Sequence, residues 1–198
     1  MKFIYSLFLL LIPLLTFSQE ELRERVEIKT SKFEIIYSET LEQPLIVKYL
    51  VECQYGSHAY SRRGLRFYKV DSVHTSDNKD YYKNVWDKGH LIPAAAYSCD
   101  EKMLKSTFTY LNCALQHQDL NRKHWKYLEA YEKKLTRYGD VSVVVEVIFN
   151  EYSKVLPTGA TVPSHFVKTI YLDNKKVGKW KFPNEGVTGN VNDFKILN

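Results

Sequence analysis

Cysteine is scarce in this sequence: of its 198 residues, only Cys53, Cys99 and Cys113 are cysteines. An odd number leaves at least one thiol unpaired even where a disulfide forms. Cys99 and Cys113 bracket a short segment and could pair, whereas Cys53 lies earlier, in a strand-like run. The sequence does not decide the pairing, and three reduced cysteines are a further alternative. No His/Asn or His/Asp setting accompanies any of the three, which argues against a cysteine nucleophile.

Long apolar runs are also scarce. Residues 3–15 form one such run, preceded by Lys2 and interrupted by Pro13, and no second run approaches this length. A bilayer-crossing helix needs about 20 apolar residues, whereas a short run after a basic residue and before small residues is typical of a secretory signal. We therefore expect residues 1–18 to be a signal peptide, cleaved before Gln19, rather than a membrane anchor. The mature protein would then be secreted or periplasmic, without stable membrane association.

Linkers, internal repeats and low-complexity tracts are lacking as well. The chain is 44% hydrophobic, which suffices for a core in a domain of this length. We expect residues 19–198 to form a single domain.

The stretch from residue 87 to 133 lacks the clustered carboxylates, histidines or cysteines of a multi-ligand metal site. It contains His90 beside a glycine, the asparagines Asn112 and Asn121, the carboxylate Glu129, and several lysines and arginines. A neutral imidazole can take a proton from water, and a hard cation held by oxygens can neutralise a phosphate. Basic side chains hold a nucleic-acid backbone. These residues together favour phosphodiester cleavage.

β-Branched and aromatic runs predict the strands, and Pro44 is expected to mark a turn between the first two. Residues 20–29 are mostly charged and are expected to form a solvated leader. The predicted strands are residues 31–37, 45–53, 85–90, 106–112, 140–150 and 164–171.

A helix is predicted from Asp119 or Asn121 to about Tyr138. Its start places Asn121 where backbone N–H groups favour an anion, and Glu129 and Lys133 share a face because they are four residues apart. Apolar residues at three- and four-residue spacing should form its buried stripe: Trp125, Leu128, Tyr131 and Leu135.

Basic residues outnumber acidic ones by six to two between residues 122 and 137, although the whole chain carries a net charge of only +5. Such clustering beside the candidate site favours a phosphate track, with Arg122 and Lys133 as substrate contacts. The alternative is an amphipathic helix whose charged side chains only face solvent.

The segment Asp-Lys-Gly-His-Leu-Ile-Pro-Ala at residues 87–94 resembles the Asp-Arg-Gly-His signature of the DNA/RNA non-specific endonucleases, which are sugar-nonspecific nucleases with a ββα-metal site. Asn112 with Gln116, the Leu-Asn-Arg-Lys-His-Trp block at 120–125 and the Leu-Glu pair at 128–129 follow in the family's order and spacing. The likeness continues through a Val-Pro-Ser-His-Phe-Val-Lys block to about residue 184.

This resemblance implies a catalytic role for each matching residue. His90 falls on the general base, and Asn121 falls on the direct ligand of Mg²⁺, for which Mn²⁺ or another divalent cation could substitute. Glu129 matches a glutamate that orients waters at the metal. Asn112 would donate to phosphate or fix the neighbouring loop.

Substrate contacts follow from the resemblance in the same way. Arg66 is the expected arginine at the scissile phosphate, because its offset to Asp71 resembles the family's, and Arg62 is the alternative. Lys88 and Lys133 stand where arginine is usual. A lysine keeps the charge but loses the two-pronged geometry of the guanidinium.

The resemblance therefore implies an α+β fold with a central, mostly antiparallel sheet flanked by helices and carrying a ββα-metal motif. We expect an exported, Mg²⁺-dependent endonuclease that cuts both DNA and RNA and leaves 5′-phosphates. One rival is a catalytically weak or inactive nucleic-acid-binding protein of the same fold. Another is a phosphodiesterase specific for small nucleotides, which would need a closed pocket.

Overall fold

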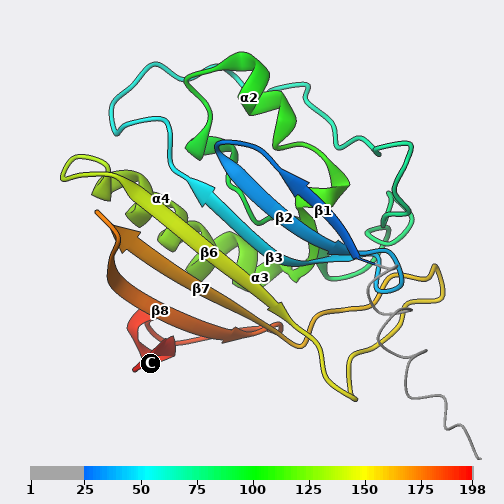
Figure 1. Cartoon of the computed structure of the whole chain (residues 1–198). Helices are drawn as coiled ribbons and strands as arrows, with labels where there is room; N and C mark the ends of the chain where they lie inside the picture. The colour runs from blue at the N-terminus through cyan, green and yellow to red at the C-terminus, as the bar shows by residue number, and fades with distance from the viewer. Residues whose placement is uncertain (1–24, 198) are drawn as a thin grey trace, which may run out of the picture.

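Seven strands form the main sheet within residues 25–197, the part of the chain that the computed structural model describes (Figure 1). The sheet order is β1-β2-β3-β6-β7-β8-β9, and every neighbouring pair is antiparallel. The expected signal peptide lies outside the described residues. Within them, no helix is long and apolar enough to span a bilayer. The strands of this sheet are β1 (Arg25–Lys29), β2 (Phe33–Ser38), β3 (Gln43–Leu50), β6 (Val141–Ile148), β7 (His165–Leu172), β8 (Lys175–Pro183) and β9 (Lys195–Ile196).

The two remaining strands form the ββα unit of the molecule. Strand β4 (Trp86–His90) pairs antiparallel with β5 (Cys113–His117). The chain then enters helix α3 (Gln118–Leu120), a π-helical turn (Asn121–Trp125) and helix α4 (Lys126–Leu135). Helix α2 (Glu101–Ser106) and short 3₁₀ turns at Ala94–Ala96 and Tyr110–Asn112 lie between β4 and β5, and a further 3₁₀ turn (Val191–Phe194) precedes β9. The α+β prediction is confirmed.

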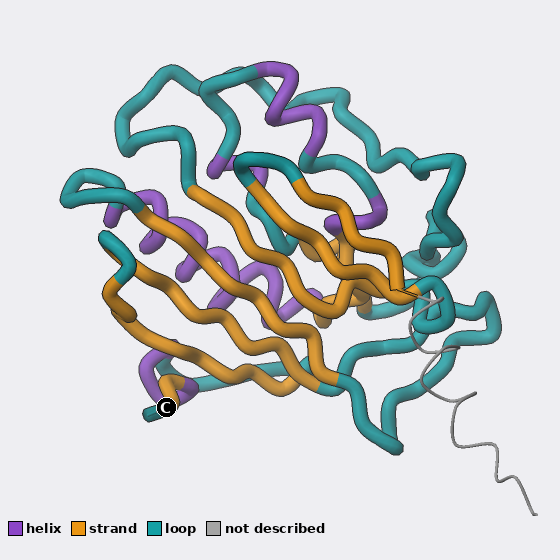
Figure 2. Tube along the Cα trace, viewed as in Figure 1, coloured by secondary structure: helices purple, strands orange, loops and turns teal. Residues whose placement is uncertain are grey.

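The core lies between one face of the main sheet and α4, which runs behind the strands in Figures 1 and 2. Strand β6 alternates strictly, with its valines at 141, 143, 145 and 147 buried and the residues between them half-exposed. Such a two-residue period is what one buried sheet face requires. From the helix side, Trp125 and Leu128 are fully buried against these strands. The ββα unit is therefore fixed to the sheet by the same packing that forms the core.

Three predicted segments differ from the structure, and β5, β8 and β9 were not predicted as strands. Residues 106–112 form the end of α2 and a 3₁₀ turn instead of a strand, because Asp100 caps α2 and Thr109 caps the turn by accepting from Leu111 N. Residues 25–29 form the edge strand β1 instead of a solvated leader. Strand β8 was not predicted, since lysines and a glycine interrupt its apolar pattern. Pro44 lies inside β3 rather than in the preceding turn.

Candidate active site

One cavity of about 660 Å³ opens between β4, the π-turn helix and the long irregular segment that joins β3 to β4. Four of the residues that line it are basic and two are acidic, so the cavity carries a net positive charge. Its walls are formed by Arg62, Asp87, Lys88, His90, Pro93, Ala94, Ala95, Asn121, Arg122, Lys126 and Glu129.

His90 is the last residue of β4 and packs between two aromatic rings. Its ring centroid lies 4.7 Å from that of Phe67 and 4.8 Å from that of Phe108. Burial, and to a smaller extent the charge of Arg62, lowers the pKa of His90 from 6.5 to about 3. Nε2 is buried and has no hydrogen-bond partner among residues 25–197, which leaves Nδ1 to meet a water in the cavity. The geometry thus presents a neutral imidazole, the form that accepts a proton.

Gly89 is required by the close packing of the two strands of the ββα unit. A Cβ at this position would lie 2.5 Å from Oε1 and 2.6 Å from Cβ of Gln116, on the paired strand β5. No real contact is that short, so any other residue would push β5 away from β4. Glycine is therefore required to close the two strands that carry the site.

Asp87 orients the two residues that begin the π-helical turn. Its Oδ2 accepts from Asn121 Nδ2 at 2.9 Å, and its two oxygens accept from Arg122 Nε and Nη2 at 2.8 and 2.7 Å. Because the Asn121 amide nitrogen is held by Asp87, its Oδ1 is the atom free to face the cavity, and it receives no hydrogen bond from the described residues. The negative charge of the Asp87 carboxylate is paired with the positive charge of the Arg122 guanidinium.

The π-helical turn brings Asn121 and Glu129 to the same cavity. In a regular α-helix of about 3.6 residues per turn, two residues eight positions apart do not lie on the same face, because two turns take only about seven residues. A π-helical turn takes up one extra residue and so brings such a pair onto the same face. Lys126 N donates to Asn121 O, five residues back, as a π turn requires. Burial raises the pKa of Glu129 to about 7, an effect that the Lys168 ammonium opposes and the neighbouring Glu132 carboxylate reinforces.

Lys88 lines the cavity, but its ammonium is held by the segment that joins β3 to β4. It donates to Asn78 Oδ1 and lies 5.3 Å from the ring centroid of Tyr110 and 5.7 Å from that of Phe67. These distances fall within the range of cation–π attraction. The same Phe67 ring packs on His90, so Lys88 helps to hold the wall against which the imidazole rests.

The structure does not bring Asn112 to the cavity. Its side chain is fully buried: Oδ1 accepts from Ile92 N at 2.8 Å, while Nδ2 donates to Ile92 O and Thr107 O at 3.0 Å each. All three bonds fix the chain that follows β4. Of the two roles considered for Asn112, these contacts support fixing the loop rather than donating to phosphate.

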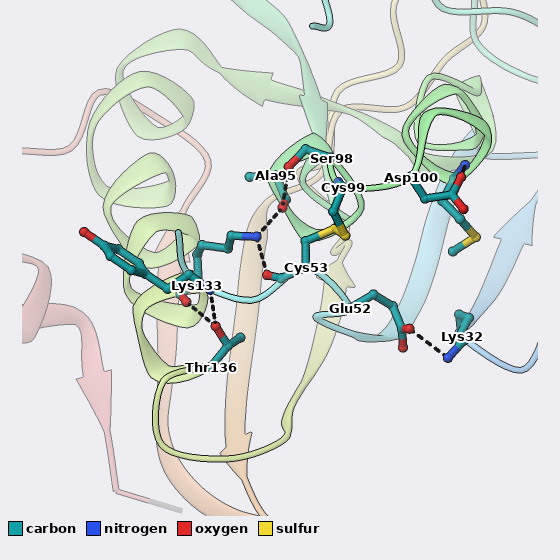
Figure 3. The surroundings of a disulfide bond; sticks show 11 residues. Lys32, Glu52, Cys53, Ala95, Ser98, Cys99, Asp100, Lys133 and Thr136 are labelled. Carbon is teal, nitrogen blue, oxygen red and sulfur yellow. Dashed lines mark hydrogen bonds and ion pairs between the residues drawn. A yellow bond between two sulfur atoms is a disulfide. The ribbon is translucent and has the colours of Figure 1, made fainter. Parts of the chain in front are cut away.

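Lys133 also lies away from the cavity and is committed elsewhere. Its Nζ donates to the carbonyl oxygens of Cys53 and Ala95, the latter at 3.3 Å (Figure 3). Partial burial lowers the pKa of this ammonium. These contacts tie α4 to the disulfide region, and they hold the Lys133 ammonium away from a phosphate bound beside His90.

The disulfide in Figure 3 joins Cys53 to Cys99, and Cys113 is a buried free thiol. The suggested Cys99–Cys113 pair is wrong, because β5 carries Cys113 into the core. The bond fastens the start of the irregular segment between β3 and β4 to the chain after β4. It thereby anchors the segment that supplies Arg62.

Of the two arginines considered for the scissile phosphate, Arg62 lines the cavity and Arg66 does not. Asp87 and Lys126 are cavity residues whose roles the sequence reading missed. The motif itself offered the signal for Asp87, its first residue. Lys126 follows Arg122 by four positions, a spacing that predicts a shared helix face.

For the nuclease activity that the sequence predicts, Arg62→Ala should lower kcat/KM for DNA by about 10- to 100-fold, because it would remove one charge-assisted contact to phosphate. Arg66→Ala is the matched control and should change kcat/KM little. Initial cleavage rates over a salt series test both variants, since loss of a phosphate contact also flattens the salt dependence by about one unit of slope. Equal losses in the two variants would contradict this assignment.

Comparison with known proteins places these features in a family. The family model for DNA/RNA non-specific endonuclease matches residues 16–196. Mitochondrial endonuclease G of Homo sapiens is 35% identical over 127 residues, covering 57% of this chain and 43% of that protein. Nuclease C1 of Cunninghamella echinulata var. echinulata is 31% identical over 145 residues, covering 64% of this chain and 58% of that protein. The chain thus spans about half the length of these curated relatives.

A solved structure shares the fold. A chain in the crystal structure of the EndoG/EndoGI complex superposes with a TM-score of 0.76 at 24% identity, covering 86% of this chain and 80% of that one. The overall fold of this chain is therefore shared with a chain of that complex. From the extent of the family match, this chain belongs to the DNA/RNA non-specific endonuclease family.

Proposed function

We propose that this protein is a divalent-metal-dependent endonuclease that hydrolyses phosphodiester bonds of both DNA and RNA. The observation that carries the proposal is the shared cavity, in which a neutral His90 and the free Oδ1 of Asn121 lie among basic side chains. The resemblance of the motif and the family membership support the same activity.

The residues present fit a hydrated Mg²⁺. Residues 25–197 contain no cluster of three or more histidine, cysteine or carboxylate side chains that could hold a metal ion. This part of the chain therefore does not suit a cation that needs several protein ligands. Mg²⁺ keeps most of its waters and binds through one or two oxygens. Asn121 Oδ1 would hold the ion, and Glu129 would accept hydrogen bonds from its waters. When bound, Mg²⁺ would supply positive charge against the phosphate.

In the proposed reaction, His90 Nδ1 takes a proton from the attacking water as the new bond from oxygen to phosphorus forms. The bond from phosphorus to the 3′-oxygen breaks, the leaving oxygen takes a proton from water, and the products carry a 5′-phosphate and a 3′-hydroxyl. Arg62, Arg122 and Lys126 hold the phosphate oxygens. Asp87 holds the Arg122 guanidinium at the cavity wall through its two-pronged contact. None of these groups requires a 2′-hydroxyl.

We further propose that the protein acts outside the cytosol as a single domain. The apolar run at residues 3–15 suits a secretory signal. The Cys53–Cys99 disulfide is typical of an oxidising compartment.

Cleavage of single-stranded DNA and RNA of one sequence tests the reaction. With Mg²⁺ the protein should shorten both strands, and the fragments should carry 5′-phosphates that a ligase accepts on DNA. Strands that are retarded in a native gel but never shortened would support the rival, a nucleic-acid-binding protein without turnover. Cleavage confined to RNA, with 2′,3′-cyclic ends, would show that the 2′-hydroxyl is the nucleophile and would overturn the mechanism.

A further inference from the structure

A lysine lies fully buried beneath the active site. Lys168, in the middle of β7, has no exposed surface, and its Nζ lies 3.5 Å from Glu132 Oε2 on α4. The Glu132 carboxylate is equally buried and accepts from the Tyr49 hydroxyl at 2.9 and 3.0 Å. The three residues form one polar cluster between the main sheet and the helix of the ββα unit.

Stability alone gives a weak account of this cluster. Removing two charges from water costs several kcal/mol each, and apolar residues of similar volume often replace a buried ion pair without loss of stability. The contacts of Lys168 beyond Glu132 offer a better account. They lead to the active site.

Trp125 connects the buried ammonium to His90. Lys168 Nζ lies 4.2 Å from the centroid of the Trp125 ring, a close cation–π distance. The indole N–H of Trp125 donates to the backbone carbonyl of His90 at 3.1 Å. Trp125 is also the last residue of the π-helical turn that begins with Asn121. One fully buried ring therefore contacts the buried ammonium, holds the histidine backbone and ends the turn that carries the proposed metal ligand.

We propose that Lys168 is a positioning residue of the active site, whose ammonium, paired with Glu132, fixes the Trp125 ring and through it the backbone of His90. This inference rests on the proposed nuclease function. It assigns a task to the lysine that ends the Val-Pro-Ser-His-Phe-Val-Lys block, which the proposed mechanism leaves unused. The influence of the same ammonium on Glu129 supports its placement beneath the site.

The test removes both charges together, because Lys168→Met alone would strand a buried carboxylate. The double variant Lys168→Met/Glu132→Gln keeps an acceptor for Tyr49 and should fold, as circular dichroism and thermal melting will show. Its kcat on a DNA oligonucleotide should fall about 10- to 100-fold, the effect of a small misplacement of a reacting group, with KM nearly unchanged. The matched control removes the half-exposed pair Lys179–Glu146, which spans 3.4 Å on the main sheet, and should keep the wild-type kcat.

Trp125→Phe provides the second arm. It keeps a ring over Lys168 but removes the N–H bond to His90, so it should also lower kcat with little change in KM. The triple variant, which combines Trp125→Phe with Lys168→Met/Glu132→Gln, should lose much less kcat than the product of the two separate losses. The reason is that both changes disturb the same contact between Trp125 and the backbone of His90.

Each outcome decides between the proposals. If the double variant folds and keeps the wild-type kcat, the role of Lys168 is overturned. If the double variant does not fold, a wild-type kcat in Trp125→Phe overturns that role instead. Fully multiplicative effects would overturn the path through Trp125. Absence of cleavage by the wild-type protein would remove the proposed function and this inference with it.

Discussion

His90→Ala should lower the rate of phosphodiester cleavage by about two to four orders of magnitude, the usual contribution of a positioned general base. Substrate affinity should change little, because Arg62, Arg122 and Lys126 remain in the cavity. Single-turnover rates on one labelled oligonucleotide measure the loss, and binding is followed separately by anisotropy. His58→Ala, which removes an exposed loop imidazole outside the cavity, is the matched control. A His90→Ala protein that cuts at the wild-type rate would disqualify His90 as the base.

The same residue gives a pH prediction. Burial among Phe67 and Phe108 disfavours the imidazolium, so the pKa of His90 falls to about 3. The neutral form accepts the proton, and lowering the pKa keeps that form populated from neutral pH down to pH 5. An NMR titration of the His90 ring should therefore show no protonation between pH 8 and pH 5. A midpoint near 6.5 in that range would contradict the burial argument.

Asn121→Ala should raise the Mg²⁺ concentration needed for half-maximal activity by at least tenfold, because it removes the one side-chain oxygen assigned to the ion. The Asn121 amide nitrogen also donates a hydrogen bond to Asp87, so in the variant Arg122 is the remaining side chain of residues 25–197 that donates to this carboxylate. Activity titrated against Mg²⁺ gives the shift directly. Asn192→Ala, at an exposed asparagine away from the cavity, should leave the titration unchanged. Superimposable Mg²⁺ curves for wild type and Asn121→Ala would refute the ligand assignment.

The parts of the molecule that local pattern can determine were predictable. The buried strand β6 and the long helix have strong periodicity, and β4 contains the Asp-Lys-Gly-His block that the resemblance identified. The ordered spacing of the motif blocks also indicated the ββα unit. By contrast, β8 contains four lysines and a glycine, and it forms a strand because its register with β7 buries Trp180 and Phe182. The burial of these two rings stabilises β8 through tertiary packing, which the local composition does not reveal.

The destinations of single side chains were the least predictable. Arg62 and Arg66 belong to the same irregular segment, and the chain's path after the Cys53–Cys99 bond decides which of them reaches the cavity. Lys133 follows Glu129 by four positions, yet it points to the carbonyls of Cys53 and Ala95. The π-helical turn also shifts the helix faces relative to a regular spacing. Each of these outcomes depends on segments that are distant in the sequence.

The metal dependence of cleavage by the wild-type protein tests the central claim most directly. Supercoiled plasmid is incubated with the purified protein in excess chelator, and Mg²⁺ is then added back to the same sample. The plasmid should stay supercoiled under chelator and then become nicked, linear and finally fragmented once free Mg²⁺ exceeds the chelator. Plasmid that is retarded but uncut under both conditions, or cut equally well under chelator, would contradict a metal-dependent nuclease built on His90 and Asn121.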